Sequence, residues 1–150
     1  MAGFNWRYSL SGGISAVAEF RAKDTETLTK GDLMNVETGE VDLAATNDTG
    51  FAGALIGAAP VSIDAEASPG VITAVDSTTW LRVYIDPYAV YGVTDANARN
   101  AGASLDIAGA TGAQTVAASS NVDVVVVETK KAAADETLVM IFGADHYLVP

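Results

Sequence analysis

The sequence predicts an all-β protein: a compact β-sandwich or barrel with an extended N-terminal arm and one or two short helical turns. Short apolar runs separated by Gly-rich turns recur about every 8–12 residues, which is typical of sandwiches and barrels. The segment 78–92 adds a second signal. There Leu81, Val83 and Ile85 alternate with polar or aromatic residues, and a period of two places one set of side chains in a core.

From about residue 21 onward the chain reads as a succession of strands. The expected strands share β-branched and other apolar residues and are bounded by turn-forming residues. They are 33–36, 41–43, 51–59, 71–75, 81–85, 89–93, 105–107, 114–117, 122–129 and 137–142. The segment 60–68 is expected to continue extended into a turn at 68–70.

Some of these elements carry more specific predictions. The loop 37–40 indicates a hairpin in which Gly39 can adopt a positive φ. The four consecutive valines at 124–127 predict a strand buried on both faces. Single helical turns are expected at 95–99, after an N-cap at Thr94 or Asp95, and at 130–136.

Residues 1–19 differ from the rest and are predicted to be the arm, with 20–150 forming a single β-rich domain. Aromatic residues crowd near the start, and Gly12-Gly13 interrupts any regular pattern. Because aromatic side chains are poorly suited to a solvated arm, we expect a partner surface to hold them. The alternative is that these rings pack over the domain's own sheet. The predicted partner-binding residues are Phe4, Trp6, Arg7, Tyr8, Phe20 and Arg21.

Composition excludes several classes of function. The 150-residue chain has a net charge of −11, which disfavours binding to nucleic acid or to an anionic membrane. It has no cysteine and one histidine, so we expect neither a metal site nor a cofactor. No apolar run is long enough to span a membrane, and the start does not resemble a signal peptide. Four of the eight basic residues fall in the first thirty positions, either by chance or as a contact surface for an acidic partner.

One group of side chains resembles part of a calcium loop. Asp95 and Asn97, followed by Asp106, have the beginning of EF-hand spacing. However, Arg99 and Asn100 stand where that loop needs a ligand and a glycine. The group is therefore interpreted as a polar turn.

Two further groups resemble catalytic arrangements. Asp145 and His146 are chain neighbours, and neighbours in a strand point to opposite faces, so they indicate a surface tail rather than a relay. Glu37, Glu40 and Asp42 could be paired carboxylates of a glycosidase. Their place at a hairpin tip indicates solvated side chains instead. We therefore expect no catalytic residues and no enzyme activity.

Several segments, taken in order, are similar to head decoration (cement) proteins of tailed bacteriophages. They are FRAKDTETLTKGDL at 20–33, NVETGEV at 35–41, TTWLRV at 78–83 with Asp86-Pro87, and YGV at 91–93 with DANAR at 95–99. The similarity extends roughly from Gly12 to Gly143 and lies in the order and type of strands and turns. It implies a small, β-tulip-like protein. Members of that family commonly form trimers on the outside of an expanded capsid, with N-terminal arms that reach neighbouring subunits.

The sequence therefore predicts a structural protein made in the host cytoplasm and carried on the outer capsid surface of a virion. Its expected partners are the major capsid protein and two further copies of itself, with no nucleic acid and no membrane. The alternative is a carbohydrate-binding or adhesin-type β-module. In that case Trp80, Tyr84, Tyr88 and Tyr91 would form a platform on which sugar rings stack.

Overall fold

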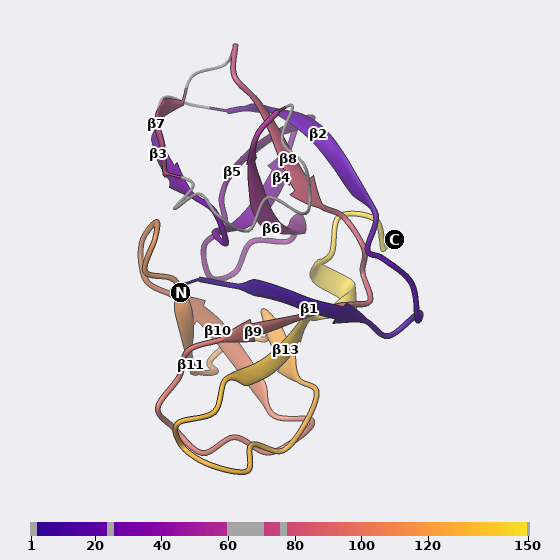
Figure 1. The fold of residues 1–150 in the computed structure, drawn as a ribbon, viewed down its shortest axis with the longest axis vertical. Coiled ribbons are helices and arrows are strands. Elements are labelled where there is room, and N and C mark those ends of the chain that lie inside the picture. Colours follow the sequence, from indigo (N-terminus) through magenta and orange to yellow (C-terminus); the bar gives the residue numbers. More distant parts are fainter. Residues whose placement is uncertain (1–2, 24–25, 60–70, 76–77, 150) are drawn as a thin grey trace.

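A computed structural model describes residues 3–23, 26–59, 71–75 and 78–149. These residues form two β bodies, one above the other in Figure 1, and the first strand, β1, crosses between them. The all-β class predicted from the sequence is confirmed. The extended segment and the turn expected at 60–70 lie outside the described residues.

The upper body is a closed five-stranded barrel with the order β2-β5-β4-β6-β8. Its strands are β2 (Val17–Ala22), β4 (Leu33–Glu37), β5 (Glu40–Leu43), β6 (Phe51–Ala58) and β8 (Trp80–Tyr84). The short strands β3 (Glu26–Thr29) and β7 (Val71–Val75) pair with each other beside it. Closure leaves these five strands without an exposed sheet edge.

The lower body is a six-stranded antiparallel sheet with the order β1-β9-β13-β12-β10-β11. Its strands are β1 (Asn5–Ser9), β9 (Ala89–Val93), β10 (Ser104–Ala108), β11 (Thr115–Ala118), β12 (Val124–Val126) and β13 (Thr137–Ile141). A single turn of 3₁₀ helix, η1 (Gly143–Asp145), follows β13.

The strands expected from residue 33 onward are present with small shifts at their ends, except that the strand expected at 122–129 is reduced to the three residues of β12. In β8 the predicted alternation is correct for Leu81 and Val83, which are fully buried, while Arg82 and Tyr84 between and after them are half-buried. Ile85, expected on the buried side, lies beyond the end of β8 and is only half-buried. The hairpin between β4 and β5 turns at Thr38 and Gly39, which both have a positive φ, 52° and 85°. Glycine adopts that conformation without the steric cost that other residues pay.

The expectation of helical turns at 95–99 and 130–136 is wrong. Asp95 binds Arg99, and Lys130 Nζ donates to the carbonyl oxygens of Asp95 and Asn97, so these two loops hold each other in irregular conformations. The expected burial of the valines on both faces is also wrong. Val124 and Val126 are buried, whereas the two valines that alternate with them are half-buried.

The N-terminal segment is not an arm in this structure. Residues 5–9 form β1, which pairs with β9 at one edge of the sheet, and β2 begins at Val17, ahead of the expected boundary at residue 20. Phe4 is 1% exposed, and its N–H donates to the carbonyl oxygen of Gly31 in the barrel body at 2.7 Å. The chain start therefore packs over the protein's own sheet, the alternative considered above.

Two hydrophobic cores lie along the molecule. One fills the barrel and includes Leu28, Met34, Val41, Leu55 and Leu81. The other lies between the barrel and the sheet. There Leu33 and Phe51 of the barrel pack with Phe4, Tyr91 and Val139 of the sheet. The barrel wall is thus the cover that the sheet needs on its apolar face.

Buried polar side chains also tie the two bodies together. The Asp32 carboxylate is fully buried and accepts hydrogen bonds from Thr29 N and Gly112 N, both at 2.8 Å, and from Thr111 Oγ1 at 2.5 Å. Gln114, beside that turn, accepts from Leu33 N at 2.6 Å and donates to a carbonyl oxygen. Satisfied groups of this kind stabilise one arrangement, whereas the same groups left unpaired would be costly.

An aromatic junction completes the contact. Trp6 stacks on Tyr84, with ring centroids 5.8 Å apart, and Tyr84 meets the edge of Tyr91 at 6.3 Å. Gly53 lies beneath this junction. A Cβ at position 53 would clash with the Tyr91 hydroxyl and would lie 2.6 Å from the carbonyl oxygen of Tyr84.

We predict that Gly53→Ala lowers the free energy of unfolding by about 1–3 kcal/mol, because backbone must shift to admit the methyl group. For a chain of this length, the melting temperature should fall by about 2–4 °C for each kcal/mol. Calorimetry measures both. The matched control is Gly13→Ala, where a Cβ meets nothing within 4 Å. Equal melting temperatures for the two variants would contradict the packing described.

Candidate functional site

The structure divides the six predicted partner-binding residues between the two bodies. Phe4 is in the core and cannot contact a partner while the chain is folded. Trp6 is half-buried, and its Nε1 donates to Ser15 Oγ at 2.7 Å. These two rings therefore serve the fold. The interpretation of Phe4 as a partner anchor is wrong, because its ring is buried in the core between the barrel and the sheet.

The neighbouring residues of β1 face the opposite side of the sheet. Arg7 forms a bidentate ion pair with Glu136, in which Nε lies 2.8 Å from Oε2, and the pair lies directly over Gly92 of β9. Tyr8 is half-buried, and its pKa is raised by burial and by the charge of Glu128. A role for Arg7 or Tyr8 in partner binding stays a prediction.

The remaining two residues lie on β2 of the barrel. Phe20 meets Tyr147 edge-on, with centroids 5.8 Å apart. The Arg21 guanidinium lies 5.6 Å from the centre of the Trp80 ring, and both side chains are exposed. The structure therefore does not bring the six residues together into one surface.

A different set of apolar side chains gathers at one end of the six-stranded sheet. Leu10 follows β1, Tyr88 precedes β9, and Phe142 follows β13. These three strands are neighbours and antiparallel, so the three residues lie at the same end, and Leu10 N donates to the carbonyl oxygen of Tyr88 at 3.0 Å. Ile14 belongs to the loop that turns back toward β2. We call these four residues the apolar end.

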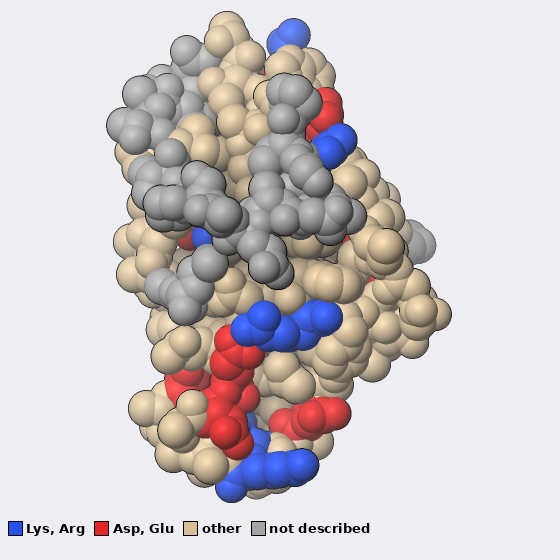
Figure 2. Space-filling model, viewed as in Figure 1, with Lys and Arg blue, Asp and Glu red and all other residues tan. Residues whose placement is uncertain are grey.

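The apolar end is well exposed and rigidly held. Ile14 is 77% exposed, Tyr88 57% and Leu10 52%. The Asp86 carboxylate accepts from Ser15 Oγ and from Tyr88 N at 2.8 and 2.9 Å, so the loop and the strand share one anchor. In Figure 2 the right-hand edge at mid-height, where this loop lies, is uncharged, while charged side chains gather lower on the same face. Grouped apolar exposure of this kind marks interaction sites.

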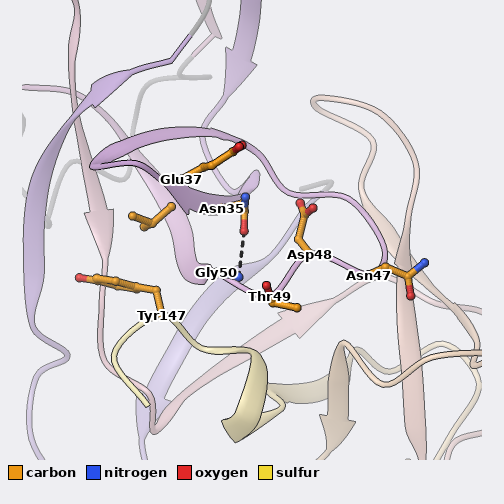
Figure 3. Close-up of a pocket in the computed structure, with 8 residues that line it drawn as sticks. Asn35, Glu37, Asn47, Asp48, Thr49, Gly50 and Tyr147 are labelled. Atoms are coloured by element: carbon orange, nitrogen blue, oxygen red, sulfur yellow. Dashed lines mark hydrogen bonds between the residues drawn. The ribbon is translucent and has the colours of Figure 1, made fainter. Parts of the chain in front are cut away.

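The second candidate is a polar depression on the barrel, with a volume of about 520 Å³. Asn35 lies at its centre, where Oδ1 accepts from Gly50 N at 3.1 Å (Figure 3). The other lining residues come from the end of β4, the loop before β6 and the chain's C-terminal segment. They are Val36, Glu37, Asn47, Asp48, Thr49, Gly50 and Tyr147.

The electrostatics of this depression are acidic. Burial raises the pKa of Asp48, and the nearby charges of Asp42, Asp123 and Glu37 raise it further, while a hydrogen bond from Ala45 N opposes them. Lys23 lies close to both Glu37 and Asp42 and offsets part of this charge.

The residues that resembled a calcium loop do not come together, whereas Glu37 and Asp42 of the glycosidase-like set do lie close to each other, on either side of the Lys23 ammonium. Asp95 binds Arg99 at 2.6 Å, whereas Asp106 accepts from residues 119–121 at the β11–β12 turn, so they belong to different networks. Across the part of the chain that the structure describes, no three acidic or histidine side chains are arranged to hold a metal ion.

His146 is a core residue rather than part of a surface tail, so that sequence interpretation is wrong. It is 1% exposed, stacks against Tyr147, and its Nδ1 accepts a hydrogen bond from Leu148 N at 3.2 Å. Burial lowers its pKa to about 4, although the charge of Asp86 opposes the shift. The ring is therefore neutral near pH 7.

The four aromatic residues considered as a sugar platform do not share an exposed face. Tyr91 is buried in the second core, and Tyr84 is covered by Trp6. Trp80 and Tyr88 are exposed, but they lie at the start of β8 and in the turn after it. That platform is not formed.

Comparisons of the chain with protein family models, with curated proteins and with solved structures found no match. The described residues contain no helix with the length and apolar character needed to cross a membrane.

We predict that Phe4→Ala destabilises the protein by about 3–5 kcal/mol, because the ring is fully buried between the barrel and the sheet. Denaturant unfolding of the purified chain measures this loss. The control is Leu10→Ala in the same segment, where the side chain is 52% exposed and the expected change is small. A Phe4→Ala protein as stable as the control would show that the first residues do not belong to the core.

We predict that His146 makes stability depend on pH. Its pKa in the folded protein, about 4, lies below the ordinary value of 6.5. The stability contributed by the neutral ring is therefore fully present above pH 6.5 and is lost as the pH falls toward 4. The loss at pH 4 is about 3 kcal/mol. Unfolding titrations of wild type and His146→Gln separate it from carboxylate titration. If both curves fall equally between pH 6.5 and 5, His146 does not carry the effect.

Proposed function

We propose that the chain is a structural decoration protein that binds the outer surface of a bacteriophage head and strengthens the contacts between capsid subunits. The observation that carries this proposal is the apolar end, an exposed group of large side chains on a rigid frame. The capsid as partner rests on the sequence similarity described above, and the major capsid protein is the proposed contact.

The shape of the molecule supports a mechanical role. The barrel and the sheet share a core and are joined by buried hydrogen bonds, so a force applied at one body is transmitted to the other. Trimers, like the capsid as partner, are proposed from the sequence similarity to head decoration proteins. Three linked copies would multiply weak contacts through effective concentration.

We predict that Leu10→Ala combined with Tyr88→Ala weakens attachment to the capsid by tenfold or more, because buried aromatic anchors dominate many interfaces. The assay is co-sedimentation with undecorated capsids of the phage that encodes the chain. Both side chains are more than half exposed, so the melting temperature should stay nearly unchanged. The control is Trp80→Ala, an exposed aromatic residue on the barrel.

Two results would contradict the proposal. In one, the control loses attachment while the double variant keeps it, which would place the contact elsewhere. In the other, cryo-microscopy of particles that carry the protein finds its density inside the head with the genome rather than on the outer surface.

A further inference from the structure

We propose that the polar depression on the barrel is a binding site for a neutral carbohydrate of one or two sugar units. Its volume of about 520 Å³ falls within the range of about 300–1,000 Å³ that is usual for small-ligand sites. Its lining residues are not those of the apolar end, so the inference stands apart from the proposed capsid contact.

The depression offers donors and acceptors side by side, as a sugar with neighbouring hydroxyl groups requires. Asn35 is 8% exposed, and its amide nitrogen, which makes no hydrogen bond to any described residue, points away from Gly50 (Figure 3). Asp48 uses Oδ2 to accept from Ala45 N at 2.7 Å, which leaves Oδ1 to accept from a ligand. The exposed Thr49 hydroxyl can do both.

Apolar groups form one side of the same depression. Val36 and Tyr147 line it, and the Tyr147 ring is fixed between the stacked ring of His146 and the edge of Phe20. Sugars present C–H groups as well as hydroxyls, and a fixed ring can pack against them at little entropic cost.

The loop that forms the opposite side is held in place before any ligand arrives. Asn47 N donates to the buried Asp123 at 3.2 Å, and Val36 N donates to the carbonyl oxygen of Gly50 at 2.7 Å. A side chain at position 50 would clash with the carbonyl oxygen of Val36 and would lie 3.1 Å from Asn35 Oδ1. The glycine therefore allows the loop to lie this close to the backbone of β4, which holds the loop in place, and preorganisation of this kind favours binding.

Charge narrows the class of ligand. The carboxylates of Glu37 and Asp48 line the depression, and Asp42 and Asp123 act on it, so phosphate and sulfate groups are repelled. Among the described residues no acidic cluster has the geometry of a metal site. A mainly polar lining is also unsuited to an apolar ligand. The Lys23 ammonium, beside Glu37 and Asp42, offsets part of the negative charge that would attract a cation. The neighbouring donors and acceptors match a neutral, hydroxyl-rich molecule.

The test is an NMR titration of the full chain with glucose, galactose, mannose, N-acetylglucosamine, lactose, maltose and chitobiose. At least one sugar should shift the backbone amide signals of Thr49 and Gly50 saturably. Thr49→Ala should weaken that binding by tenfold or more. Asn35→Asp should do the same, because it keeps the acceptor for Gly50 N but removes the free donor.

Matched controls carry the same changes outside the depression. Thr46→Ala and Asn100→Asp replace exposed residues that do not line it, and both should bind like wild type. The proposal is overturned if no sugar of the panel moves the Gly50 amide, or if Thr49→Ala binds like wild type. It is also overturned if calcium chloride or methylammonium shifts these amides while the sugars do not. Capsid co-sedimentation of Thr49→Ala should be unchanged, so the two proposals fail separately.

Discussion

The contact between the barrel and the six-stranded sheet is the constraint on which the rest of the structure depends. The barrel has a core of its own, but the apolar face of the sheet is covered only by this contact, in which Leu33 and Phe51 of the barrel share one cluster with Tyr91 of the sheet and with Phe4 just before it. The buried Asp32 carboxylate fixes the orientation of the two bodies relative to each other, because its oxygens accept hydrogen bonds from backbone and hydroxyl donors in both bodies. Apolar burial supplies most of the driving force, and the satisfied polar links select one orientation.

Strands whose pattern is complete within a few residues could be predicted, whereas a strand that depends on distant partners could not. Strand β8 is visible locally, because its alternation is complete within a few residues and its Leu81 and Val83 fill the barrel. Strand β1 is different. Its pattern is interrupted by an irregularity between Trp6 and Tyr8, and its partner β9 lies about eighty positions away. A short aromatic segment with distant partners has the local appearance of an arm. Its membership of a sheet is decided by tertiary packing.

Neither candidate surface could be predicted from the sequence, because each combines residues that are distant along the chain. The apolar end combines residues that follow β1, precede β9 and follow β13, and only strand pairing brings them together. The depression joins Asn35 in a strand with Asp48 in a loop and Tyr147 near the chain end. Asp123 is similar, because it occupies a turn-like sequence yet is buried and accepts from Asn47 N and Ile107 N. An aspartate in this sequence indicates a polar turn, and its hydrogen-bond donors become visible only in the folded structure.

The net charge of the protein limits the kinds of partner that its surfaces can attract. The chain carries −11, and much of its positive charge is used internally. Ion pairs join Arg7 to Glu136, Lys23 to Glu37, and Arg99 to Asp95. Few cations then remain to attract an acidic partner. Exposed ion pairs of this kind also contribute little to the stability of a fold or of a contact. Attachment through uncharged apolar side chains avoids this difficulty, since burial of apolar area needs no opposite charge. In the proposed attachment, the net negative charge of the remaining surface repels other acidic surfaces, so contact is confined to the apolar end.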